Sequence, residues 1–404
     1  MKYLKPINDS GFKYNHLIGI GGIGSGIFFK LFGNHTIGRN ESREGELLPN
    51  KDYCKLHIIT HYLASLLGTI ENKFRIYPIG GIGNDPIGEY LFEEMKMLGM
   101  NMKSVKRFLD SSTLFSVCFQ YPDFTGGNIT SSNSASSKLN QIDITSFFNG
   151  FEEDKEKEII LSVPEVPIEP RLKILEIGRS RGSFNACSVS SFEIKEFNKK
   201  NSFINIDLLA INIDEAKTIA SLHKMEKYRY LKKSYSEIKI SKTVRNDSET
   251  IRNVDTLNNI CKNNSASVAN ILNSCITFLV KRNPNMMIAI TDGPNGSYGY
   301  YNNSLEFTPA IDVDVKATGG AGDAFMAGIL AGLCCGLPFL KGKNEDVFYE
   351  IPLRCALELG SLLASLSVTS VDSINHEINA VFIKEFVKKS NSVLSHHFKS
   401  IFRD

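Results

Sequence analysis

A glycine-rich turn followed by an apolar helix, within residues 316–333, constrains the fold of this chain more than any other segment. The sequence from residue 316 reads Lys-Ala-Thr-Gly-Gly-Ala-Gly-Asp, and nearly every position from there to Leu333 is apolar or small. A helix without a polar stripe is buried, so its N-terminus points out of the core. Backbone N–H groups and the helix dipole there favour an anion. Asp323 stands inside this anion site, either as a plain capping carboxylate or as a functional one.

The composition describes a globular chain and excludes several classes of function. The chain has 404 residues, 42% hydrophobic and 22% charged, with a net charge of +2, so nothing favours nucleic acid as a partner. No apolar run reaches the length of a membrane span, and the first residues lack the apolar segment of a signal peptide. The eight cysteines are scattered without paired spacing. We therefore expect a cytoplasmic protein that binds neither nucleic acid nor a membrane.

Short apolar strands alternate with helical patterns along most of the chain. The clearest strands are expected at residues 75–79, 159–163, 203–211 and 286–290. This alternation predicts a mostly parallel sheet with helices on both faces. A helix at 215–222 is followed by residues 224–265, which are rich in Lys, Asn and Ser and predict a surface insertion. Helices at 348–368 and 378–394 are expected to close the chain.

Glycines near the start of the chain raise a second hypothesis. Gly19, Gly21 and Gly24 have the spacing of a dinucleotide-binding fingerprint, and Glu41 lies where a ribose contact would be. This pattern would suit a nucleotide-linked (NAD) oxidoreductase. A true fingerprint opens a crossover helix, however, whereas residues 32–38 read as a loop. The alternative is a strand whose glycines allow close approach of a ligand or of neighbouring backbone.

Two histidines lie on one face of the helix expected at residues 53–67. Cys54, His57 and His61 have the spacing of neighbours on a helix surface. Two histidines four residues apart can bind zinc, but no third ligand is apparent in the sequence. Substrate contact or plain packing is therefore favoured over a metal site.

Four segments in order resemble the ribokinase-like (PfkB) carbohydrate kinase family. Residues 80–91 are similar to its Gly-x-Val-Gly-x-Asp-x-x-Gly-x-x-Leu signature, and residues 212–216 to its Asn-x-x-Glu motif. Thr291, Gly293 and Gly296 correspond to its nucleotide-binding turn, and residues 320–323 to its anion-hole and catalytic-base motif. The resemblance extends over residues 16–373, apart from the predicted insertion.

The resemblance implies a fold and a domain organisation. The expected fold is a ribokinase-like three-layer sandwich, with a mostly parallel central sheet and a small β lid built from residues 28–50 and 112–130. The kinase domain would cover residues 1–385, and residues 386–404 would form a C-terminal helical tail. Members of the family often dimerise through the lid, so a homodimer is an open expectation.

The resemblance also implies an activity: ATP- and Mg²⁺-dependent phosphorylation of a hydroxyl group on a sugar, polyol or nucleoside. Phosphoryl transfer depends mainly on positioning and charge stabilisation. The N–H groups of Gly320, Ala321 and Gly322 would stabilise charge on the transferred phosphoryl group. Asp323 would accept the proton of the attacking hydroxyl, and a carboxylate at a helix N-terminus is expected to be ionised near neutral pH.

Cofactor-binding residues follow from the same resemblance. Asn212 and Glu215 would hold Mg²⁺ through water, because that ion prefers oxygen ligands and retains water. For Glu215 alone, the plainer interpretation is a glutamate favoured in the first turn of a helix. The nucleotide is expected to contact four residues: Thr291, Gly293, Gly296 and Thr318.

The acceptor pocket departs from the family pattern. Residues 21–26 occupy the region where many members place a sugar-binding aspartate, and residues 52–57 replace the usual Gly-Gly-x-x-x-Asn segment. Ala317 stands where members that bind a monovalent cation often have aspartate, which argues against potassium activation. A non-catalytic ligand-binding member of the same fold is therefore a further alternative. By position only, the candidate acceptor ligands are Asn40, Glu41, Arg43, His57 and His61.

Overall fold

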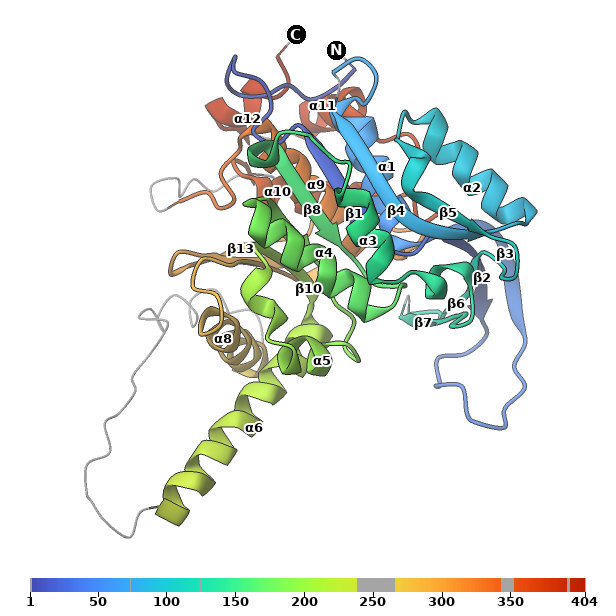
Figure 1. Ribbon diagram of the computed structural model, residues 1–404. Helices are drawn as coiled ribbons and strands as arrows, with labels where there is room; N and C mark the ends of the chain where they lie inside the picture. The colour runs from blue at the N-terminus through green and yellow to red at the C-terminus, as the bar shows by residue number, and fades with distance from the viewer. Residues whose placement is uncertain are drawn as a thin grey trace. The chain divides into compact units, whose positions relative to one another are not determined.

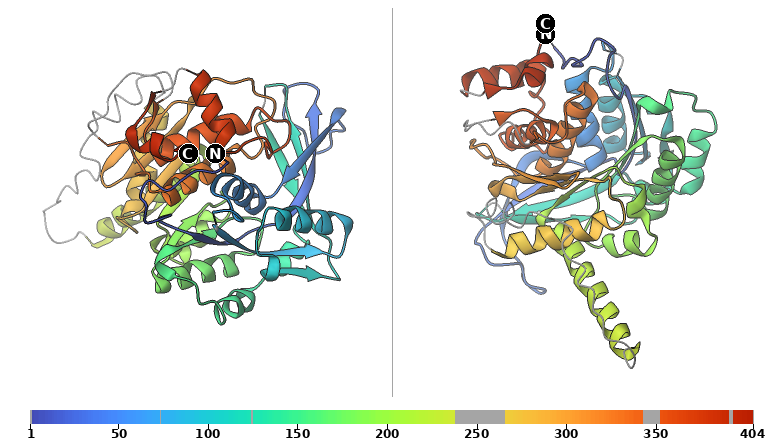
Figure 2. Two further views of the ribbon diagram at one scale, coloured as in Figure 1. Left: turned by 90° about the horizontal axis from the view of Figure 1, so that it is seen from above. Right: turned by 90° about the vertical axis from the view of Figure 1, so that its left-hand side faces the viewer.

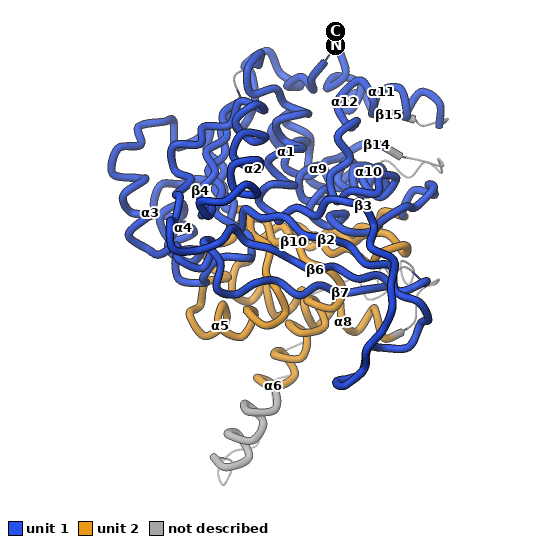
Figure 3. Tube along the Cα trace, turned by 90° about the vertical axis from the view of Figure 1, so that its right-hand side faces the viewer, with its two compact units in different colours: residues 1–185, 310–404 blue, residues 186–309 orange. Residues whose placement is uncertain are grey.

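The computed structural model describes residues 2–72, 74–123, 125–237, 266–342, 352–390 and 393–403 (Figure 1). The chain divides into two compact units, one formed by residues 1–185 with 310–404 and the other by residues 186–309 (Figure 3).

A parallel sheet forms the centre of the first unit. Its strands lie in the order β8-β1-β4-β5, and all three pairings are parallel. β1 and β8 are buried at every position, as is typical of strands covered on both faces. Because parallel strands end at the same edge, the residues after β1 and β8 lie together: the Gly22 N–H donates to the Pro164 carbonyl (3.2 Å). The bounds are β1 (His16–Ile20), β4 (Arg75–Gly83), β5 (Val105–Phe108) and β8 (Glu158–Ser162).

Helices of the first unit surround α9, the helix expected from its apolar sequence. α9 (Ala321–Cys335) is buried from Asp323 to its end and packs against α1 and α10. Glycines permit this approach, since a Cβ added at Gly328 would lie 2.8 Å from the Cα of Gly360 in α10. The other elements are α1 (Lys55–Leu67), α2 (Pro86–Met97), α3 (Gln141–Phe148), α4 (Ile168–Arg181), α10 (Ala356–Ser367), α11 (Ala380–Lys389), α12 (His396–Ser400), β14 (Pro352–Leu353) and β15 (Val393–Leu394).

A separate four-stranded sheet in the first unit corresponds to the expected lid. Its strands lie in the order β3-β2-β6-β7. β2 pairs antiparallel with β3 and parallel with β6, while β6 and β7 form an antiparallel pair. The bounds are β2 (Gly24–Leu31), β3 (Gly45–Tyr53), β6 (Leu114–Gln120) and β7 (Gly126–Thr130).

The second unit combines parallel and antiparallel pairing. β10 pairs parallel with β9 and β11, and β11, β12 and β13 continue as an antiparallel meander. Asn302 and Asn303, both at positive φ, make the turn between β12 and β13. Helices α6 and α8 pack against each other. The bounds are β9 (Phe184–Cys187), β10 (Leu208–Asn212), β11 (Met287–Thr291), β12 (Ser297–Tyr301), β13 (Ser304–Thr308), α5 (Ile194–Lys199), α6 (Ile213–Glu237) and α8 (Ala266–Val280).

The predicted fold class is confirmed, while several element boundaries differ. The chain is mixed α/β, with mostly parallel strands, helices and a smaller separate sheet. The helix expected at 215–222 is longer, because α6 continues to Glu237 into the predicted insertion; residues 238–265 lie outside the described residues. Of the helices expected at 348–368 and 378–394, the structure describes α10 and the shorter α11.

Residues near the two ends of the chain lie side by side in the first unit (Figure 2). The Lys5 N–H donates to the Ile401 carbonyl (2.9 Å), and Nη2 of Arg403 donates to the Pro6 carbonyl (3.1 Å). Among the described helices, none combines the length and the apolar character needed to cross a membrane.

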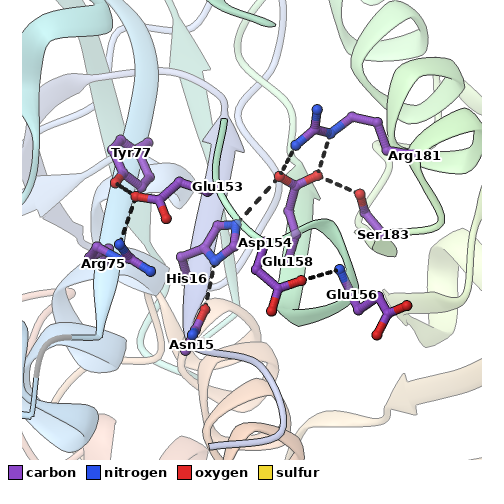
Figure 4. Close-up of polar contacts among 10 residues, drawn as sticks. All are labelled: Asn15, His16, Arg75, Tyr77, Glu153, Asp154, Glu156, Glu158, Arg181 and Ser183. Atoms are coloured by element: carbon purple, nitrogen blue, oxygen red, sulfur yellow. Dashed lines mark hydrogen bonds and ion pairs between the residues drawn. The ribbon is translucent and has the colours of Figure 1, made fainter. Parts of the chain in front are cut away.

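A buried carboxylate network lies at the amino edge of the parallel sheet (Figure 4). Glu158, the first residue of β8, is fully buried, and Arg181 donates to its two oxygens from Nε (2.9 Å) and Nη2 (2.8 Å). The Ser183 hydroxyl also donates to this carboxylate, and His16 Nε2 lies 3.4 Å from Oε2. Burial alone would raise the pKa of Glu158, but the bonds to His16, Arg181 and Ser183 outweigh it and lower the pKa to about 2.

The network predicts a pH-dependent contribution to stability. Because the folded pKa of Glu158 lies below its ordinary value of 4.5, its stabilisation is complete above pH 4.5 and is lost as the pH falls toward 2. Glu158→Gln is expected to lower the free energy of unfolding at pH 7 by about 3 kcal/mol, since Arg181 keeps a buried charge without its counter-ion.

Urea unfolding of wild type and variant at pH 7 and at pH 2–3 measures this effect. The difference between the two proteins should shrink at the lower pH. Glu89→Gln is the matched control, because its ion pair with Arg107 is largely exposed and contributes less than about 1 kcal/mol. A Glu158→Gln effect that is the same at both pH values would contradict the electrostatic origin.

Candidate active site

The predicted base lies next to a lysine. Asp323, in the first turn of α9, is 8% exposed, and Nζ of Lys55 lies 3.3 and 3.4 Å from its two carboxylate oxygens. Lys55 is the first residue of α1, so two helix starts bring these side chains together. Burial raises the pKa of Asp323 and Lys55 lowers it, and the pKa ends above its ordinary value of 3.8. The effect of the helix dipole, on which the sequence prediction relied, is therefore opposed by burial.

Glu165 adds a second carboxylate that sequence reasoning did not nominate. Its Oε2 accepts a hydrogen bond from the Lys55 backbone N–H (3.1 Å), and its own backbone is left-handed (φ 76°). Burial raises its pKa to about 7, with Lys55 opposing the shift and Asp323 adding to it. A Cβ added at Gly22 would lie 2.6 Å from the Cβ of Glu165. Glycine after β1 therefore makes room for this glutamate.

The lid supplies a third carboxylate. Asp52 on β3 accepts hydrogen bonds through Oδ2 from the Ser116 hydroxyl (2.6 Å) and the Cys118 thiol (3.1 Å), both on β6. Its charge contributes to the raised pKa of Asp323. The lid also meets the glycine turn, since Cζ of Phe28 lies 3.0 Å from where a Cβ of Gly319 would be. The lid and the start of α9 thus border one site within the first unit.

The glycine turn before α9 has the form of an anion site. Gly320 is the N-cap residue, with φ 80°, a conformation that glycine adopts readily. The Ala321 N–H makes only a long bond (3.4 Å) to the Thr318 carbonyl, and Thr318 is exposed. A Cβ added at Gly322 would meet no atom within 4 Å. The space beside Gly322 is therefore open, and N–H groups at the start of a helix can bind an anion in such a place.

The predicted magnesium ligands lie in the second unit and bond to each other. Asn212 and Glu215 form a reciprocal cap at the start of α6: the Asn212 N–H donates to Glu215 (2.8 Å) and the Glu215 N–H donates to Asn212 Oδ1 (2.9 Å). These bonds agree with the plainer interpretation of Glu215 as a residue that stabilises the start of a helix. An amide and a carboxylate at the end of a strand also suit water-mediated Mg²⁺. This role stays a prediction.

The predicted nucleotide turn lies beside them. Thr291 stands opposite Asn212 in the parallel pairing of β10 and β11. Gly293 and Gly296 both have positive φ, and the turn closes through a bond from the Asp292 N–H to the Gly296 carbonyl (2.8 Å). Burial raises the pKa of Asp292, whose Oδ2 has no hydrogen-bond partner among the described residues. Asp292 is a polar group of this turn that the motif did not include.

Three of the candidate acceptor ligands lie in the loop between β2 and β3. Nε of Arg43 donates to Glu41 (2.8 Å), and the Gly38 N–H donates to Glu41 as well (2.8 Å). These two bonds lower the pKa of Glu41 to about 2, the bond from Gly38 being the larger cause. Asn40 is exposed in the same loop. The bonds of Glu41 and Arg43 described here are to residues of the same loop, and its role in acceptor binding stays a prediction.

The hypothesis of a dinucleotide fingerprint requires a helix directly after the first strand, and the structure does not have one there. β1 leads into strand β2 at Gly24 and not into a helix. Glu41 is engaged by Arg43 and Gly38, as described above. The glycines serve the alternative interpretation, since a Cβ at Gly21 or Gly24 would lie 2.4 Å from a neighbouring residue.

The two candidate histidines are buried in α1. His57 Nε2 lies 3.7 Å from Glu94, and the ring of His61 lies 4.8 Å from that of His376. Burial lowers the pKa of His57 to about 3, so the ring is neutral at physiological pH. Within the described part of the chain, no group of three or more His, Cys, Asp or Glu side chains is arranged to hold a metal ion. Packing is thus the best-supported role, and acceptor binding by these histidines stays a prediction.

Comparisons with known proteins agree with this architecture. The ribokinase of Cryptococcus neoformans var. grubii serotype A, solved with ADP, superposes with a TM-score of 0.64 and 17% identity over 92% of this chain and 99% of that one. The nucleoside kinase of Burkholderia thailandensis, solved with inosine, gives 0.61 and 15% over 92% and 97%. The ribokinase of Thermotoga maritima gives 0.59 and 16% over 93% and 100%. These likenesses show a ribokinase-like fold.

The family follows from the sequence itself. The model of the pfkB family of carbohydrate kinases matches residues 60–379, and the chain belongs to that family. No curated protein sequence matches the chain. The predicted family and kinase class are therefore confirmed.

Three residues of the site were missed from the sequence: Lys55, Glu165 and Asp52. Glu165 could have been predicted from the sequence, because it closely follows the strand predicted at 159–163. Ligands bind at the carboxyl ends of parallel strands. No sequence pattern pointed to Lys55 or Asp52, since their segment does not match the family pattern.

Proposed function

We propose that this protein transfers the γ-phosphoryl group of ATP to a hydroxyl group of a sugar, polyol or nucleoside. The observation that carries the proposal is the buried Asp323 carboxylate at a glycine turn, paired with Lys55, in a chain of the pfkB family. Phosphoryl transfer depends mainly on positioning the reactants and stabilising charge, so the proposal needs no covalent intermediate.

Asp323 would act as the general base. Burial raises the pKa of Asp323, which makes it a better proton acceptor, and the charge of Lys55 favours its ionised form. N–H groups of Gly320, Ala321 and Gly322 would donate to the phosphoryl oxygens as negative charge develops on them. Glu165 and Asp52 would bind other hydroxyl groups of the acceptor. With a pKa of about 7, Glu165 can donate or accept a hydrogen bond at neutral pH.

The nucleotide and metal roles extend the proposal to the second unit. Asn212 and Glu215 would hold Mg²⁺ through water, and the ion would supply charge neutralisation for the phosphates. Thr291, Gly293 and Gly296 would contact the nucleotide, with Thr318 near its phosphates. The complex of the Cryptococcus ribokinase with ADP supports nucleotide binding by this fold. The inosine complex of the Burkholderia kinase supports a nucleoside as one acceptor class.

An acceptor panel tests the proposal directly. ADP formation from ATP and Mg²⁺ is measured with pentoses, hexoses, inositols and nucleosides, each with and without EDTA. We expect at least one acceptor to raise ADP formation by roughly a hundredfold or more, and EDTA to abolish the increase. Tight NAD(H) binding without ATP binding would support the oxidoreductase alternative. Thermal stabilisation by acceptors without turnover would support the non-catalytic one.

A further inference from the structure

The segment after α10, residues 369–376, is bonded to the lid. The backbone N–H of Tyr53 on β3 donates to the Ser373 hydroxyl (2.9 Å), and the Ser373 N–H donates to the Lys51 carbonyl (3.2 Å). The Lys51 N–H donates to Oδ1 of Asp372 (2.7 Å). Ser373 is 1% exposed, so its bonds are sheltered from water. Three hydrogen bonds therefore tie this segment to strand β3.

The same serine lies against the glycine turn of α9. A Cβ added at Gly320 would lie 2.4 Å from the Ser373 carbonyl oxygen and 3.2 Å from its Cβ. A Cβ added at Gly319 would lie 3.8 Å from the Ser373 Cβ. Because the closest atom belongs to the backbone, no rotamer change can relieve the contact. Gly320 is the N-cap residue, so its position sets the direction of the first N–H groups of α9.

The segment is itself anchored to the core. The Asn375 N–H donates to the Tyr62 hydroxyl on α1 (2.8 Å), and the Asn375 amide donates to the Leu366 carbonyl at the end of α10 (3.1 Å). Close-packed elements of this kind transmit small displacements. A shift of β3 would therefore reach Gly320 through Ser373.

We propose that Ser373 is a positioning residue that couples lid strand β3 to the anion hole at Gly320. The inference rests on the proposed function and specifies how its site is regulated. Asp52, the residue before Tyr53, accepts hydrogen bonds from Ser116 and Cys118 of the lid and is one of the carboxylates proposed to bind the acceptor. An acceptor that engages Asp52 draws β3 toward the site, and Ser373 carries this movement to the N–H groups that stabilise the transferred phosphoryl group.

Turnover of the full-length chain tests the coupling, with ATP, Mg²⁺ and the best acceptor of the panel. Ser373→Ala is expected to lower the kcat of acceptor-dependent ADP formation about tenfold, because the Tyr53 N–H loses its partner. ATP hydrolysis without acceptor should fall clearly less than the acceptor-dependent reaction, since no acceptor draws on the lid in that reaction. Ser373→Thr, which keeps the hydroxyl, should recover most of the rate. Equal losses in both reactions would indicate a purely structural role and overturn the coupling.

Ser367→Ala is the matched control. Ser367 is also buried, at 2% exposed, but its hydroxyl donates to the Ala364 carbonyl of its own helix and has no described bond to β3. We expect both reactions of this variant to stay within about twofold of wild type. A loss equal to that of Ser373→Ala would overturn the proposal.

Hydrogen exchange without any ligand separates failure of the coupling from failure of the proposed function. Ser373→Ala is expected to speed amide exchange about tenfold in residues 45–53 and also in residues 316–326, whereas Ser367→Ala changes neither. Faster exchange confined to residues 45–53 would overturn the coupling, whatever the activity. Absence of acceptor-dependent ADP formation in the wild type would instead overturn the proposed function, while exchange would still decide the coupling.

Discussion

Asp323→Asn is expected to lower acceptor-dependent ADP formation by roughly a thousandfold, because the amide cannot take the proton of the attacking hydroxyl. The variant should remain folded, since Asn has nearly the same shape and the contact to Lys55 lies at 3.3 and 3.4 Å, the length of a modest hydrogen bond. Steady-state kcat/KM with the best acceptor measures the first effect, and the melting temperature measures the second.

The control for this variant is Asp312→Asn, which makes the same chemical change at an exposed aspartate upstream of the turn. Its activity should stay within about twofold of wild type. Turnover by Asp323→Asn equal to wild type would remove Asp323 from the role of base.

The pH dependence of the wild type has a defined sign. The pKa of Asp323 is raised above its ordinary value of 3.8, mainly by burial. As the pH is lowered, activity should therefore be lost at a higher pH than it would be with an exposed aspartate as the base.

Gly320→Ala is expected to disrupt both the fold and the anion hole. Its φ of 80° is strained for alanine, and the new Cβ would lie 2.4 Å from the Ser373 carbonyl oxygen. Backbone strain and this clash together should lower the free energy of unfolding by about 3 kcal/mol. Misplaced N–H groups should lower kcat by roughly a hundredfold. Urea denaturation and turnover measure the two effects.

Gly322→Ala separates this mechanism from a general intolerance of the turn to alanine. Its φ is not left-handed, and a Cβ there would meet no atom within 4 Å. Because alanine favours a helix over glycine, the stability of this variant should be unchanged or higher by about 0.5–1 kcal/mol. Equal stability losses at Gly320 and Gly322 would contradict the role assigned to the Ser373 contact.

Local patterns explain why much of the fold was predictable. Continuous apolar strands such as 159–163 and the apolar helix after Asp323 are typical of a parallel sheet with both faces covered, and the structure has them. The lid strands followed from the family resemblance. Boundaries were less accurate where sequence periodicity is weak, as at α6, which continues to Glu237.

Candidate acceptor residues were harder to place from the sequence than the glycine turn before α9. His57 and His61 share a helix face, but periodicity cannot say whether that face meets a ligand or the core; here it is buried. Arg43 and Glu41 satisfy each other within one loop, which residue type alone does not reveal.

The sequence by itself determined the elements whose physics is local: the glycine turn, the buried helix behind it, the alternation of strands and helices, and Asp323 at a helix start. Tertiary structure alone decided which distant side chains gather around Asp323 and its glycine turn. Lys55 and Asp52 come from the segment between lid and first helix, Glu165 from the end of another strand, and Ser373 from after α10. Such contacts depend on packing between segments up to 320 residues apart, and neither propensity nor spacing encodes them.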